Sequence, residues 1–67
     1  MSYPKLRGAI REKFGTQGAF AKALRIDQSG LSKRLAGKQE WTWAEVQAAC
    51  ELLEIPADRI SDYFFKD

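Results

Sequence analysis

The chain of 67 residues contains no histidine and one cysteine, Cys50, and these shortages exclude several classes of protein. A single cysteine cannot form a disulfide within the chain, so the sequence lacks the framework of small disulfide-rich domains. Without histidine and with one thiol, a zinc or haem site has too few ligands, and we expect no metal and no other cofactor. The chain has no nucleophile paired with a base and no glycine-rich phosphate loop, so we do not expect an enzyme.

Long apolar runs are also absent. No stretch approaches the ~18 apolar residues of a membrane-spanning helix, and no secretory signal is evident, so we expect a cytoplasmic protein without a membrane partner. The composition, 45% hydrophobic and 30% charged, is typical of a globular chain. Its length predicts one small domain over residues 1–67.

Acidic residues are scarce in the first half of the chain. Residues 1–38 hold nine Lys or Arg and two acids, a net charge of +7, whereas residues 39–67 hold two basic and seven acidic residues, a net charge of −5. A basic half beside an acidic half indicates one face suited to a polyanion. Chance clustering in a short chain is the alternative.

The spacing of apolar residues is helical throughout, and no segment alternates as a strand does. Pro4 suits the first turn of a helix, Gly15 suits its end, and Thr16 and Asp27 are candidate N-caps for the next two helices. We expect an all-α bundle of five helices over residues 4–14, 17–24, 28–36, 43–53 and 57–65. The residues expected to face inward are Leu6, Ile10, Phe14, Phe20, Ala21, Leu24, Leu31, Leu35, Val46, Ala49, Cys50, Leu53, Ile60 and Phe64.

The segment "WTWAEV" carries the strongest local signal. Thr42 and Glu45 have the spacing of a capping box, and Trp41 and Val46 have that of a hydrophobic staple around it. The staple predicts that Trp41 contacts the core, whereas Trp43 falls on the outside of the helix.

The stretch "IDQSGLSKRLAGK" at residues 26–38 has an unusual polar face, with short polar groups first, cations next and no acid after Asp27. A turn of about three residues joins it to the preceding short helix. Such a pair is typical of a helix-turn-helix, whose second helix enters the major groove of DNA. Glutamine can pair with adenine and lysine with guanine, while carboxylates would be repelled by phosphates.

The stretch "TQGAFAKALRIDQSGLSKRLAGK" resembles the helix-turn-helix of the lambda repressor and Cro-like, or XRE-type, family. The matching features are Gln17, Phe20-Ala21, Leu24, Ile26, Gln28-Ser29-Gly30-Leu31-Ser32 and Gly37-Lys38. The rest of the chain is similar to small phage-borne regulators of Gram-positive bacteria. The resemblance implies a lambda-repressor-like bundle that binds a double-stranded DNA operator sequence-specifically and regulates transcription as a repressor or switch.

The resemblance also implies roles for individual residues. Base edges would be contacted from the helix at 28–36 by Gln28, Ser29, Ser32 and Lys33, and Ser32 could reach a phosphate instead. Phosphates would be contacted by Thr16, Gln17, Lys38 and Gln39. We expect a weak homodimer that is completed on DNA, with candidate contacts at Trp43, Tyr63 and Phe65.

Several alternatives stay open at the level of sequence. Arg25 and Glu54 stand where the family usually has glycine, so either a left-handed backbone is strained there or the turns differ. Arg34 either contacts DNA or folds back over core aromatics. The exposed polar face could be an ordinary solvated one. An antitoxin of a toxin–antitoxin pair would use the same DNA-binding domain, and a helical protein-interaction adaptor would use the aromatic tail without any DNA function.

Overall fold

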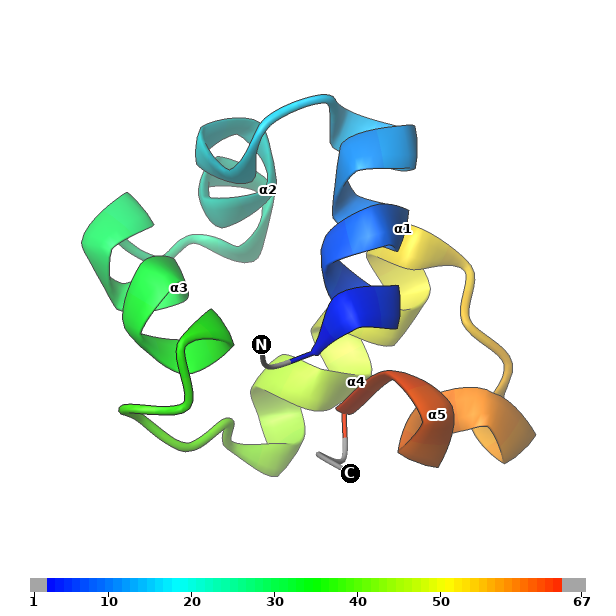
Figure 1. The fold of residues 1–67 in the computed structure, drawn as a ribbon. Coiled ribbons are helices and arrows are strands. Elements are labelled where there is room, and N and C mark those ends of the chain that lie inside the picture. Colours follow the sequence, from blue (N-terminus) through cyan, green and yellow to red (C-terminus); the bar gives the residue numbers. More distant parts are fainter. Residues whose placement is uncertain (1–2, 65–67) are drawn as a thin grey trace.

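The computed structural model describes residues 3–64, and every regular element in that part of the chain is helical (Figure 1). The elements are α1 (Pro4–Phe14), α2 (Gln17–Leu24), α3 (Gln28–Leu35), α4 (Trp43–Leu53), the 3-10 turn η1 (Ala57–Arg59) and α5 (Ile60–Phe64). The all-helical fold with five α-helices is therefore confirmed. α3 ends one residue earlier than expected. The last expected helix begins with the 3-10 turn η1 and continues as the α-helix α5.

All three expected N-cap positions are confirmed, but only two of the three side chains make a capping hydrogen bond. The Thr16 hydroxyl accepts from the Ala19 amide at 3.1 Å. At α4 the capping box is complete, with the Glu45 amide donating to the Thr42 hydroxyl at 3.1 Å and the Thr42 amide donating to Glu45 Oε1 at 3.0 Å. Asp27 occupies the N-cap position of α3, but its side chain makes no capping hydrogen bond. The sequence located this position correctly but did not determine the orientation of its side chain.

Helices α2, α3 and α4 end in the same way, with one residue in the left-handed region. These residues are Arg25 at φ 63°, Gly37 at φ 81° and Glu54 at φ 57°. In each case the amide that follows bonds to the carbonyl five residues earlier, at 2.9–3.0 Å, which is the closure of a Schellman motif. The backbone at Arg25 and Glu54 is therefore left-handed, at a cost of roughly 1–2 kcal/mol for each non-glycine residue.

The core draws side chains from all five α-helices and from the segment that follows α4. Its buried apolar members are Leu6, Ile10, Phe20, Ala21, Leu31, Leu35, Val46, Ala49, Cys50, Leu53, Ile55 and Phe64. Phe14, Leu24 and Ile60 were expected inside but are only half-buried. Each is the first or last residue of its helix and lies at the edge of the core. Phe14 still packs against Phe20, with the ring centroids 5.2 Å apart.

An aromatic cluster joins the two ends of the described chain. Trp41 packs edge-on against Tyr3 and Phe64, with ring centroids 6.5 and 5.1 Å apart. This contact places Trp41 against the core, as the staple predicted. By contrast, Trp43 is 62% exposed.

The arrangement separates two faces of the molecule (Figure 1). Helices α2 and α3 pack together on one side, and α4 and α5 lie toward the other. α1 contacts α2, α4 and α5, and α2 also packs directly against α4. Within residues 3–64, no helix has the length and apolar character needed to cross a bilayer.

Candidate nucleic-acid interface

The four residues predicted to contact bases share one exposed face of α3. The inner face of this helix is fixed by Leu31 and Leu35, which are both fully buried. Because these anchors point into the core, the opposite side of the helix faces solvent. Ser29, Ser32 and Lys33 are exposed there, and Gln28, three residues before Leu31, is exposed at the first position of the helix beside α2. The structure thus brings them together, and their contact with bases stays a prediction.

Arg34 lies on the other side of α3 and is only 8% exposed. Its Nε and Nη2 donate to the two carboxylate oxygens of Glu45 at 3.0 and 2.8 Å, and its Nη1 donates to the Gly30 carbonyl at 2.9 Å. The guanidinium therefore turns inward, toward a carboxylate and not over the aromatic rings. This ion pair connects α3 to the first turn of α4.

The charge of Arg34 is neutralised locally by this pair. The hydrogen bond from Arg34 is the main influence on the Glu45 carboxyl, and it holds the pKa of that group below its ordinary value despite partial burial. The pair has side-chain exposures of 10% for Arg34 and 20% for Glu45. Lys33 consequently supplies the outward positive charge of α3.

Gly18 makes room for the side chain of Gln28. A Cβ atom at position 18 would lie 3.1 Å from Gln28 Oε1, closer than the neighbouring atoms would tolerate without moving. The side-chain amide of Gln28, the first residue of α3, therefore lies against the first turn of α2. The sequence interpretation did not include Gly18, because this contact joins two helices and leaves no local pattern.

The residues predicted to contact phosphates lie at two places beside α3. Thr16 and Gln17 are at the start of α2, where Thr16 is exposed and Gln17 is half-buried. Lys38 and Gln39 are exposed in the loop that follows α3. The two pairs therefore flank the polar face, and their contact with phosphate stays a prediction.

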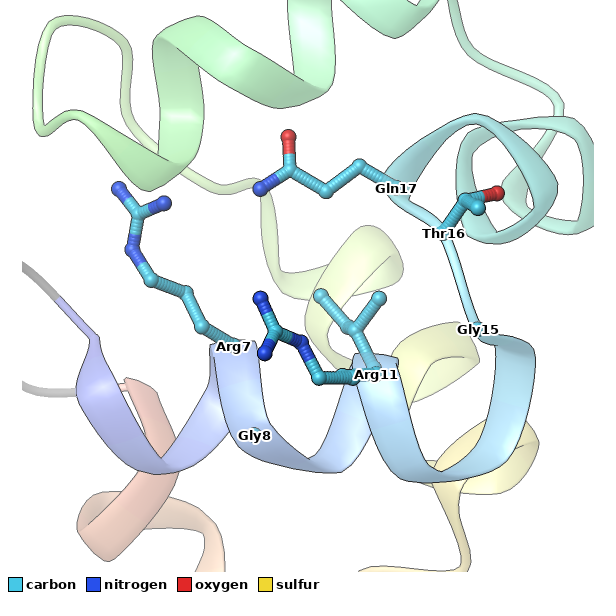
Figure 2. A pocket seen from close by; sticks show the side chains of 7 residues that line it. Arg7, Gly8, Arg11, Gly15, Thr16 and Gln17 are labelled. Atoms are coloured by element: carbon cyan, nitrogen blue, oxygen red, sulfur yellow. The ribbon is translucent and has the colours of Figure 1, made fainter.

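A hollow of about 500 Å³ lies between α1 and the start of α2 (Figure 2). The side chains of Arg7, Arg11 and Gln17 reach into the same space in this view. The lining is completed by Gly8, Ile10, Gly15 and Thr16. Arg7 Nη2 also donates to the carbonyl of Leu35, the last residue of α3, at 2.8 Å. The sequence interpretation missed the two arginines of α1, although their spacing of four residues places them on one side of a helix.

A second surface, which we term the aromatic groove, has a volume of about 550 Å³. It is lined by Tyr3, Glu40, Trp41, Trp43, Val46, Ile60 and Phe64. Of the candidate dimer contacts, Trp43 lines this groove, Tyr63 is half-buried, and Phe65 lies outside the described residues.

In the part of the chain that the structure describes, no group of three or more metal-ligating residues could hold an ion.

Comparison with known proteins gives a family and a similar structure. The family described as "Protein of unknown function (DUF739)" matches residues 1–67. The chain is similar to the modulator of repression (MOR) of the temperate bacteriophage TP901-1 from Lactococcus lactis, which has a solution structure. The two are 38% identical with a TM-score of 0.85, and the match covers 96% of this chain and 86% of the other. No curated protein matches the chain.

Proposed function

The chain belongs to the DUF739 family of proteins of unknown function, and from this premise we propose that it is a small phage regulator that binds duplex DNA through α3. The relative of known structure is named for modulation of repression. Identity of 38% over nearly the whole chain supports the same general role here. The proposed activity is therefore regulatory, without a catalytic step.

The exposed face of α3 is the observation that carries the proposal. It offers amide, hydroxyl and ammonium groups and no carboxylate, and the remaining cation of the helix is turned inward toward Glu45. In the proposed complex Gln28 pairs with adenine and Lys33 with guanine, since these side chains match the groups that those bases present in the major groove. Ser29 and Ser32 bond to neighbouring base edges.

Contacts on either side of α3 would set its register on the duplex. Thr16 and Gln17 at the start of α2, and Lys38 and Gln39 after α3, bind phosphates in this proposal. Such contacts position a protein but do not read sequence. An operator of two half-sites about 34 Å apart would be occupied by a weak homodimer that forms on the DNA.

Two substitutions separate base reading from phosphate binding. A tight site is first selected from randomised duplexes, and the variants are then titrated against it and against a random duplex. We expect Gln28→Ala to cost roughly 1–3 kcal/mol on the selected site and little on the random one. Lys38→Ala should weaken both and lower the slope of log affinity against log salt by about 1. Equal losses for Gln28→Ala on both duplexes would mean that α3 does not read bases.

The aromatic groove favours a second candidate, a protein-interaction adaptor. A protein that modulates repression can act on the operator or on the repressor that occupies it. Trp43 is a large aromatic side chain that is 62% exposed at the groove, and such residues are enriched at protein interfaces. If the folded protein binds no duplex even at low salt, and Trp43→Ser abolishes its binding to a repressor from the same phage genome, the adaptor is the correct assignment.

A further inference from the structure

The side-chain amide of Gln28 lies across the first turn of α2, at the one place where Gly18 has no side chain. A Cβ atom at position 18 would lie 3.1 Å from Gln28 Oε1, 3.5 Å from Cδ and 3.9 Å from Nε2. All three atoms of the amide group are therefore close to the same point of the α2 backbone. The end of the Gln28 side chain occupies the space that a side chain at position 18 would fill.

The glycine is explained by the position of this amide and not by the packing of the helices. Gly18 is the second residue of α2, and glycine is unfavourable in a helix relative to alanine. The three atoms that a Cβ would meet first all belong to the amide of Gln28, which is the far end of a flexible side chain. A larger residue at position 18 would leave the helix intact and displace the amide.

Gln28 remains available to a base in this position. The residue is exposed although its amide touches α2, so the side of the amide that faces away from Gly18 is open to solvent. A glutamine that pairs with adenine uses its oxygen and its nitrogen together, and both atoms must be placed correctly. The position of the whole amide group therefore matters for base recognition.

We propose that Gly18 is a specificity-determining residue, which acts by fixing where the amide of Gln28 lies when α3 enters the major groove. The proposal rests on the DNA binding proposed above, and Gly18 itself needs no contact with DNA. A glutamine side chain has several rotamers of similar energy, and the contact with α2 restricts them before the duplex arrives. An interface side chain that is ordered in advance loses less conformational entropy on binding.

The contact also links base reading to backbone binding. The first turn of α2, which Gln28 touches, is the part of the molecule proposed to contact phosphate on one side of α3. An amide held against this turn has a fixed place relative to the DNA backbone. Such a link between positioning contacts and base contacts sets the register in which a base is read.

The first test uses Gly18→Ala, with Gly8→Ala as the matched control. Both substitutions add one methyl group to a helical glycine, but a Cβ at position 8 would meet nothing within 4 Å. We expect Gly18→Ala to weaken binding to the selected site roughly twofold to tenfold, as for the loss of one pre-ordered side chain, and to change binding to a random duplex little. The control should bind both duplexes as the wild type does. Equal affinities of Gly18→Ala and the wild type for the selected site would overturn the proposal.

Melting temperatures separate this effect from damage to the fold. Neither Gly18→Ala nor Gly8→Ala should melt below the wild type, because alanine favours a helix more than glycine does. A merely structural role for Gly18 would lower stability and weaken binding to both duplexes together. That result would overturn the proposal.

The same exchange in a Gln28→Ala background shows whether Gly18 acts through Gln28. We expect Gly18→Ala to have no further effect once the amide is absent, and the base pair at which it relaxes specificity should be the one affected by Gln28→Ala. An equal loss in both backgrounds would mean that the added methyl group disturbs the DNA directly, and would overturn the proposal while leaving the proposed function intact.

The contact can also be tested without DNA. In nuclear Overhauser spectra of the free protein, we expect cross-peaks between the Hα protons of Gly18 and the side-chain amide protons of Gln28, because the two groups touch. Their absence from the folded protein would overturn the role of Gly18 whether or not the protein binds DNA. A wild-type protein that shows the cross-peaks but binds no duplex at low salt would overturn the proposed function, and the role of Gly18 with it.

Discussion

Substitution of Arg34 by Met should destabilise the fold severely, although the substitution keeps most of the apolar stem. The guanidinium makes three hydrogen bonds of 2.8–3.0 Å, two of them to Glu45. Methionine makes none of them and leaves the Glu45 carboxylate paired only through the cap at Thr42. The carboxylate is 20% exposed and so recovers a little solvation.

The expected loss follows from that geometry. Removing one partner of a buried ion pair costs about 3–5 kcal/mol, and the residual exposure of Glu45 reduces this to about 2–3 kcal/mol. At roughly 0.05–0.15 kcal/mol per residue, a chain of 67 residues has a total stability of about 3–10 kcal/mol. The loss is therefore a large fraction of the whole, and the melting temperature should fall by roughly 8–24 °C.

The assay is thermal and urea unfolding followed by circular dichroism, with Arg59→Met as the matched control. Arg59 pairs with Asp62 at 3.3 Å, but the two side chains are 58% and 42% exposed. The control should lose at most about 0.5 kcal/mol, because solvent screens an exposed pair. The double variant Arg34→Met/Glu45→Gln should recover part of the loss, since no unpaired buried charge remains. Similar melting temperatures for Arg34→Met and Arg59→Met would refute the reasoning.

Further predictions concern single positions. The pKa of Glu45 is lowered in the folded state, mainly by its hydrogen bond from Arg34. The stabilisation that Glu45 provides is therefore fully present above the pKa of an unfolded glutamate and is lost as the pH falls through the lower folded pKa, so Glu45→Gln should flatten the acid limb of a plot of stability against pH. Arg25→Gly should raise the free energy of unfolding by roughly 1 kcal/mol in urea titrations, because the backbone is left-handed at φ 63°. Leu31→Ala should cost roughly 2–5 kcal/mol in the same titrations, since the side chain is fully buried. Burial raises the pKa of the Cys50 thiol, so a disulfide reagent near neutral pH should modify it slowly in the folded protein and rapidly after unfolding.

The sequence by itself determined the helices and the faces that they present. The capping box at Thr42 and Glu45 and the buried pair Leu31 and Leu35 involve residues three or four positions apart, so their geometry follows from the helix itself. For the same reason, the outward direction of Ser29 and Lys33 could be predicted before the structure was known.

Only the tertiary structure decided how the long polar side chains are partnered. Arg34 reaches a carboxylate 11 residues away, Arg7 reaches a carbonyl 28 residues away, and Gln28 lies against the backbone of another helix at Gly18. The sequence left the position of Arg34 open, did not connect Arg7 with Gln17, and gave no sign of Gly18. An arginine or glutamine has many rotamers of similar energy, so its partner depends on which helices pack against its own and in what register.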